Sequence, residues 1–186
     1  MMNEELKLKN FNLFINKLNQ IGVNINVDDD MKEKIMNASF AISNENGCAY
    51  DGSLLHIILR TLTPFALKIN ELLQEDMRVN PNSIIKVCLL SHISKCEMFI
   101  KNDNQWEIEK RGMIYKYAPS NVALKMGARS IILAEKLGVK FSDEEFEAMM
   151  NLDRNEDDMQ AKYYSSTLSV IIRQANELTF LQNKFN

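Results

Sequence analysis

Histidine, cysteine, proline and glycine are scarce in this chain of 186 residues, which holds two, three, three and six of them, respectively. With only His56 and His92 present, any site that needs three imidazoles is excluded. Three cysteines are too few for a secreted disulfide framework, so we expect a reducing compartment. The chain also lacks a large excess of charge of either sign. Its 22 basic and 25 acidic residues give a net charge of −3, which argues against duplex DNA as a partner.

Long apolar runs and several enzyme motifs are missing as well. No stretch approaches the roughly 20 apolar residues that span a bilayer. The N-terminal residues lack the charged-then-apolar pattern of a signal peptide. The sequence contains no Gly-x-Ser-x-Gly elbow, no phosphate-binding glycine loop and no dinucleotide fingerprint. We therefore expect a cytoplasmic protein without membrane association.

Helical periodicity runs along most of the chain. We expect helices over about residues 6–21, 28–40, 51–73, 84–100, 121–137 and 161–181, and a short helix that begins at 141–142. Pro64 predicts a break in the third of these, and Pro81 fits the first turn of the fourth. Gly138 is placed as a C-terminal cap, and Ser142 with Glu145 has the spacing of a capping box.

The segment 84–100 is apolar on most sides, which predicts a helix buried at the centre of the fold. Residues 101–120 read as the longest irregular connection and contain Trp106, the single tryptophan. No convincing pair of strands is present. The prediction is an all-α protein that forms one domain over residues 1–186.

Four parts of the sequence, in order, resemble the HD-domain metal-dependent phosphohydrolases, an all-α family that holds metal ions with histidines and aspartates. The similar segments are Tyr-Asp-Gly-Ser-Leu-Leu-His-Ile at 50–57, Val-Cys-Leu-Leu-Ser-His-Ile-Ser-Lys at 87–95, Gly-Ala-Arg-Ser at 127–130 with Phe-Ser-Asp-Glu-Glu-Phe-Glu-Ala-Met at 141–149, and Ile-Ile-Arg-Gln-Ala-Asn-Glu-Leu at 171–178. The resemblance implies a single HD-like helical bundle with a core at about 45–180 and an N-terminal helical extension at 1–44.

The resemblance also assigns positions to the family's metal ligands, and this chain departs from the family at all of them. Aligned without gaps, they carry Ile57, Ser91, His92, Met126, Leu152 and Asn176. Hydrocarbon side chains cannot ligate, and asparagine offers an oxygen without negative charge. Shifting the alignment by one residue would put His56 and His92 on histidine positions, yet Ile93 and Asn176 would still replace both aspartates. In either register we expect no metal and no cofactor.

Basic side chains near this remnant site suggest another role. Lys95, Arg129 and Arg173 lie in segments that converge on the metal cleft of the family, so the resemblance places them where they can bind a phosphate-bearing ligand. The alternative is that the two arginines pair with acids on solvated faces. His56, on a leucine-rich segment, is either a ligand-binding residue or a hydrogen-bonded core residue.

The sequence leaves two alternative roles open for each of three further sets of residues. Cys88, His92 and Cys96 share a helical face and are either core residues or a metal or thiol site. Trp106 is either a surface anchor for a partner or a lid on the bundle. Tyr163 and Tyr164 either line the cleft or belong to the core.

The leading hypothesis is a catalytically inactive HD-like helical domain that binds a protein partner or a small phosphate-bearing ligand. The alternatives are a phosphohydrolase acting on nucleotides or phosphate esters with an atypical site, and an interaction module with a closed cleft. The identity of the partner and the presence of a homo-oligomer are left open by the sequence.

Purified protein is expected to contain no iron, manganese, magnesium or zinc at the remnant site. Ser91, His92 and Asn176 are too weak a ligand set to offset the dehydration of a small cation. Hydrolysis of nucleotides and phosphate esters should be absent for the same reason. Elemental analysis and a phosphatase assay check both expectations, and near-stoichiometric metal that is lost in His92→Ala would contradict them.

Overall fold

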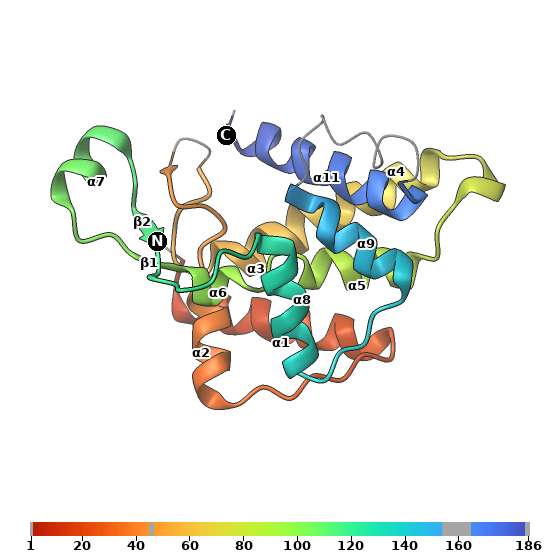
Figure 1. Cartoon of the computed structure of the whole chain (residues 1–186), viewed down its shortest axis with the longest axis horizontal. Coiled ribbons are helices and arrows are strands. Elements are labelled where there is room, and N and C mark those ends of the chain that lie inside the picture. The colour runs from red at the N-terminus through yellow and green to blue at the C-terminus, as the bar shows by residue number, and fades with distance from the viewer. Residues whose placement is uncertain (1, 45–46, 154–164, 185–186) are drawn as a thin grey trace.

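Helices make up most of the chain in a computed structural model, which describes residues 2–44, 47–153 and 165–184 (Figure 1). The helices are α1 (Glu4–Gln20), α2 (Asp29–Asn37), α3 (Ser53–Ile57), α4 (Thr63–Leu72), α5 (Pro81–Leu90), α6 (Lys95–Met98), α7 (Gln105–Arg111), α8 (Met126–Lys136), α9 (Asp143–Met150) and α11 (Thr167–Lys184). The strands are β1 (Phe99–Lys101) and β2 (Tyr115–Tyr117). The predicted all-α class is confirmed. Within the described residues, no helix is both long and apolar enough to cross a bilayer.

Helix α5 forms the centre of the bundle, between α1 on one side and α11 on the other (Figure 1). It also contacts α4, α8 and α9, and its side chains from Val87 to Leu90 are completely buried. Helices α1 and α2 pack against α3, and Phe14 and Leu18 of α1 join the same hydrophobic core. The prediction of a central apolar helix is therefore confirmed for its first half.

The predicted continuation of that helix to Ile100 is wrong. After Leu90 the backbone N–H groups of Ile93 and Lys95 donate to carbonyls three residues earlier, which tightens the chain into turns before the short α6. The N–H of Ser94 donates to the hydroxyl of Ser130 on α8, at 3.3 Å. A partner from a distant helix thus replaces a local one, and helical periodicity gave no sign of it. Cys96 consequently does not share a continuous helix with Cys88.

Local signals placed most other helix ends correctly. Helix α1 ends before Gly22, α8 ends before Gly138, and Ser142 with Glu145 forms the predicted capping box of α9. Pro81 is the first residue of α5. Pro64 lies in the first turn of α4, directly after a π-helical turn (Ile58–Leu62) that interrupts the expected helix.

Two helix starts differ from the prediction. Helix α8 begins at Met126 instead of Asn121, because Arg129 holds the preceding residues in a loop through hydrogen bonds to the carbonyls of Val122 and Leu124. Helix α11 begins at Thr167. The predicted start at Ala161 and the side chains of Tyr163 and Tyr164 lie outside the described residues.

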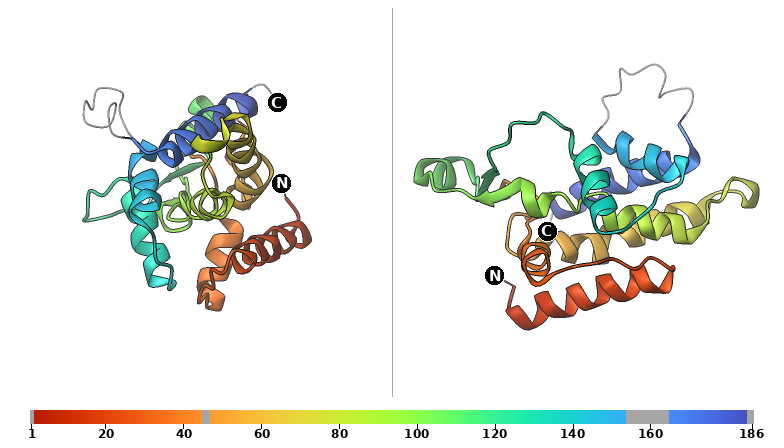
Figure 2. Two further views of the ribbon diagram at one scale, coloured as in Figure 1. Left: turned by 90° about the vertical axis from the view of Figure 1, so that its right-hand side faces the viewer. Right: turned by 60° about the horizontal axis from the view of Figure 1, so that its bottom comes forward.

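The connection predicted to be irregular forms an arm. Strands β1 and β2 pair antiparallel, with Phe99 opposite Tyr117 and Lys101 opposite Tyr115, and α7 lies between them. The expectation that the chain has no strand pair is therefore wrong, and three residues per strand are too few for alternation to reveal it. Figures 1 and 2 show the arm projecting away from the bundle. Trp106, on α7, is 61% exposed.

Helices α8 and α9 cross with almost no space between their backbones at Gly127. A Cβ atom added to Gly127 would lie 2.1 Å from the carbonyl oxygen of Met149. The neighbouring atom belongs to backbone, which cannot move aside as a flexible side chain can. Glycine at this position is therefore required by the packing of α8 on α9.

We expect Gly127→Ala to lower the free energy of unfolding by roughly 2 kcal/mol, because forced overpacking outweighs the better helix propensity of alanine. Urea denaturation measures this. Ala128→Gly, in the same turn, is the matched control and should cost no more than about 1 kcal/mol of helix propensity. An unchanged stability of Gly127→Ala would contradict the close crossing of the two helices.

Candidate functional site

The positions that the resemblance assigns to metal ligands lie mostly inside the bundle. Ile57 and Leu152 belong to the hydrophobic core, and Ser91 is fully buried, with its hydroxyl 3.4 Å from the carbonyl oxygen of Cys88. Met126 is half-buried at the start of α8. Among the described residues, no three His, Cys, Asp or Glu side chains are grouped so that they could hold a metal ion.

His92 and Asn176 are the two remnant positions whose side chains the fold joins. Nε2 of His92 lies 3.0 Å from Oδ1 of Asn176 on α11, although the residues are 84 positions apart in sequence. The ring of Phe40 packs on the imidazole at 4.8 Å between centroids, and Phe180 packs on Phe40 in turn. His92 is completely buried beneath the ring of Phe40, whereas Asn176 is half-buried.

The environment of His92 keeps its imidazole neutral. Burial lowers the pKa of His92 well below its usual value, and the charge of Lys95 lowers it further, while the hydrogen bond with Asn176 opposes them. With Nε2–H donating to Asn176, the other ring nitrogen, Nδ1, has no hydrogen-bond partner within the described residues. A neutral, sealed imidazole of this kind is suited to linking α11 to the centre of the bundle.

The candidate anion-binding residues do not share a site. Lys95 is buried, and its Nζ donates to the carbonyl oxygen of Phe40 at 2.7 Å. The same Nζ lies 3.9 Å from the centre of the Phe40 ring. Arg129 donates to Ser120 and to two backbone carbonyls of the loop before α8. Arg173 is half-buried on α11, and no hydrogen bond or ion pair to another described residue is seen for it. His56 is 3.2 Å from the hydroxyl of Tyr50.

The cysteines are interior residues and not a thiol site. Cys48, Cys88 and Cys96 are all buried and unbridged. Burial raises the pKa of Cys48 to about 11 and that of Cys96 to about 12, and it raises the pKa of Cys88 as well. Because the thiolate is the reactive form, these environments favour the core interpretation of the Cys88, His92 and Cys96 set.

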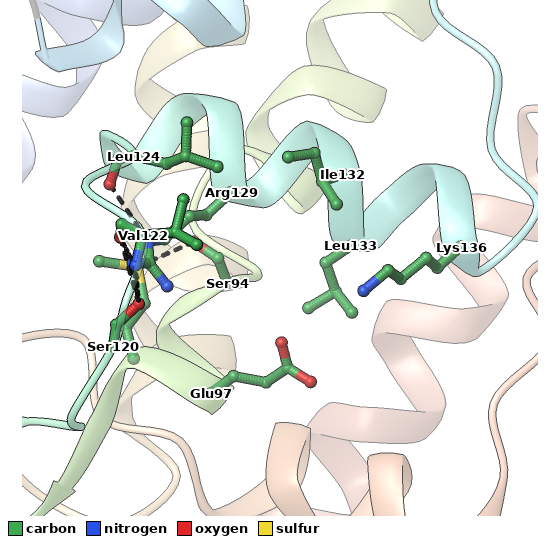
Figure 3. Close-up of a pocket in the computed structure, with 10 residues that line it drawn as sticks. Ser94, Glu97, Ser120, Val122, Leu124, Arg129, Ile132, Leu133 and Lys136 are labelled. Carbon is green, nitrogen blue, oxygen red and sulfur yellow. Dashed lines mark hydrogen bonds between the residues drawn. The ribbon is translucent and has the colours of Figure 1, made fainter.

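An open groove lies beside α8, on the surface of the bundle (Figure 3). It consists of two adjoining cavities of about 200 and 300 Å³, which share Glu97 and Met98 of α6 with Arg129 of α8. The side chains that line the first cavity are those of Ser94, Glu97, Met98, Ser120, Val122, Leu124, Arg129, Ile132, Leu133 and Lys136. Sequence reasoning found Arg129 here but missed Glu97 and Lys136, because exposed charges on helices carry no signal that separates a groove from a solvated face.

The base of the arm is fastened to the bundle by a second polar cluster. The hydroxyl of Tyr115 on β2 donates to Asp51 at 2.5 Å, and Nζ of Lys101 on β1 lies 2.7 Å from the same carboxylate. Burial by itself would raise the pKa of Asp51, but hydrogen bonds from Lys101 and Tyr115 outweigh it and lower that pKa. Asp51 precedes α3, so the cluster fixes where the arm leaves the bundle.

The stability of the protein is expected to fall as the pH is lowered from about 6.5 to 5. The folded pKa of His92 lies below its unfolded value, so the unfolded chain binds the additional proton first. One such proton gives a slope of at most about 1.4 kcal/mol per pH unit. Urea denaturation at several pH values measures it.

His92→Gln should remove most of this slope, even if it lowers the stability at pH 7. His56→Gln is the matched control and should keep most of it, because His56 is only half-buried. An equal slope in wild type and His92→Gln would contradict a buried neutral imidazole at this position.

Comparison of the chain with protein-family models, with curated proteins and with solved structures found no match. The fold and the site are therefore described from the chain's own residues. Membership of the HD-domain phosphohydrolases stays a prediction that rests on the four similar segments.

Proposed function

We propose that this chain is a non-catalytic, HD-like helical domain that binds a protein partner. The chemistry of the remnant positions supports the first part. Ile57 and Leu152 are buried hydrocarbon side chains, and Nε2 of His92 bonds to Oδ1 of Asn176. Metal-assisted hydrolysis depends on ligands that hold a cation with positions open to water and substrate. The residues at these positions do not have that chemistry.

Binding of a phosphate-bearing ligand has less support than binding of a protein. An anion at Lys95 would have to reach the interior and replace the carbonyl oxygen of Phe40. An anion at Arg129 would compete with three oxygens of the loop that the guanidinium already binds. Strong anion sites instead place several donors around one vacant position.

The observation that supports protein binding most directly is the exposure of Trp106 on an anchored arm. Tryptophan is one of the residue types that are enriched among the energetically dominant residues of protein interfaces. Trp106 is 61% exposed on α7, and the hydrogen bonds of Asp51 fix the base of the arm that carries it. Of the two interpretations of Trp106, its exposure favours the surface anchor over the lid.

Capture from a lysate of the source organism tests the proposal. Tagged full-length chain is expected to retain a specific partner, and Trp106→Ala should weaken that capture by roughly 30-fold, the effect of losing about 2 kcal/mol at an interface. Phe146→Ala is the matched control, because Phe146 is an aromatic residue on α9 that is 47% exposed and distant in sequence from the arm.

Two results would contradict the proposed function. The first is capture that Trp106→Ala leaves unchanged while Phe146→Ala abolishes it. The second is metal-dependent turnover of nucleotides or phosphate esters that tracks the pure protein, which would restore the phosphohydrolase alternative. Calorimetric titration with nucleotides and inorganic phosphate tests the small-ligand alternative, with Arg173→Ala as its control.

A further inference from the structure

The groove beside α8 has two helical walls. One wall is α8, which contributes Arg129, Ile132, Leu133 and Lys136, at the i, i+3, i+4 and i+7 positions of one face. The other is α6, which contributes Glu97 and Met98. Arg129 binds Ser120, Val122 and Leu124 and so holds the loop that closes one end (Figure 3).

Apolar side chains form the bottom and part of the rim of this groove. Leu133 is almost fully buried at the bottom, whereas Ile132 is 41% exposed, and Val122 and Leu124 are also exposed on the loop. Exposed apolar side chains that gather around one concave surface commonly mark a binding site. A cavity of about 200 Å³ is large enough to receive an apolar side chain of a partner.

Two opposite charges face the groove from its two walls. The carboxylate of Glu97 and the ammonium of Lys136 extend toward it in Figure 3. No side-chain hydrogen bond or salt bridge to another described residue is seen for either of them, and Glu97 interacts with Lys34 only through its charge, which helps to raise the pKa of Lys34. Both charges are thus available to a partner, and they favour one that brings a basic group to Glu97 and an acidic group to Lys136.

The walls determine the conformation of the partner segment. Most backbone groups of α8 are engaged in that helix, and the N–H groups of α6 donate to carbonyls of residues 92–94. The carbonyls of Val122 and Leu124 accept hydrogen bonds from Arg129. An extended peptide would therefore bring backbone N–H and C=O groups into a groove that offers them few partners. A helix satisfies its own backbone and presents only side chains.

We infer that this groove docks an amphipathic helix of a partner protein, with an apolar side chain in the cavity, a basic residue at Glu97 and an acidic residue at Lys136. This rests on the proposed function as an interaction domain, but it concerns a surface separate from Trp106. The arm and the groove then bind two parts of one partner or two partners.

Synthetic peptides test the inference directly. The probe is a fluorescein-labelled, alanine-based peptide of about 16 residues, long enough to populate a helix, with leucines at i and i+4 and one arginine and one glutamate flanking them. Two further peptides keep the leucines and carry only acidic or only basic flanking residues. Fluorescence anisotropy with the full-length chain should show the tightest binding for the peptide of mixed charge.

Substitutions in the groove should weaken binding of the peptide of mixed charge, and the size of the effect should depend on whether a charge or an apolar contact is lost. Glu97→Gln and Lys136→Gln should each raise the Kd about two- to five-fold, as expected for exposed ion pairs. Ile132→Ser should raise it roughly ten-fold through the loss of apolar contact. Glu135→Gln and Lys110→Gln are the matched controls, since both residues are exposed and neither lines the groove, and they should leave the Kd unchanged.

The inference is overturned if the mixed peptide does not bind below about 1 mM, a free energy near −4 kcal/mol, or if all three peptides bind equally well. It is also overturned if the control variants weaken binding as much as Glu97→Gln and Lys136→Gln. Such a failure leaves the proposed function standing when capture still depends on Trp106. If peptide binding in the groove and Trp106-dependent capture both fail, the inferred docking site and the proposed interaction domain are refuted together.

Discussion

Burial of the C-terminal half of α5 on all sides is the constraint on which the rest of the structure depends. The helix has hydrocarbon or thiol side chains at every position from Val87 to Leu90, and all are sealed from water. The polar residues that follow it, His92, Ser94 and Lys95, are buried too and must find partners in the interior, because an unpaired buried polar group costs about 1–3 kcal/mol.

Those partners come from three different parts of the chain. His92 binds Asn176 on α11, Ser94 binds the hydroxyl of Ser130 on α8 at 2.8 Å, and Lys95 donates to the carbonyl oxygen of Phe40. The end of α5 is therefore a junction that fixes two helices and the segment after α2. Each of these bonds joins residues that are distant in sequence, so the junction forms only when the bundle assembles.

The same junction separates the interior from the surfaces available for binding. The side chains of His92, Asn176 and Lys95, which the sequence resemblance assigns to a cleft, hold the bundle together in this structure. The exposed groove and the arm both arise from the chain between α5 and α9, where α6, β1, α7, β2 and α8 follow one another. Glu97 and Lys136 face the groove, and Trp106 lies on the arm. The surfaces that we propose for binding thus both lie on the connections around the buried core.

The sequence by itself determined the features that depend on neighbouring residues. The capping box at Ser142 and Glu145, the stop at Gly138 and the start at Pro81 follow from hydrogen bonds and backbone angles within a few residues, so they could be read directly. The apolar pattern that begins at Ile84 likewise predicted the burial seen from Val87 to Leu90, because a helix that is apolar on most sides must be covered on several of them.

Only the tertiary structure decided where α5 ends, where α8 begins and what the remnant residues do. The hydroxyl of Ser130 accepts a hydrogen bond from the N–H of Ser94, and the side chain of Asn176 forms a hydrogen bond with His92. Arg129 holds the loop before α8 by hydrogen bonding to it. Spacing along the chain does not encode these contacts, since they depend on which helices pack together. The exposure of Trp106 was open for the same reason: whether a side chain meets solvent or a neighbour depends on the path of the arm, which Asp51 fixes through Tyr115 and Lys101.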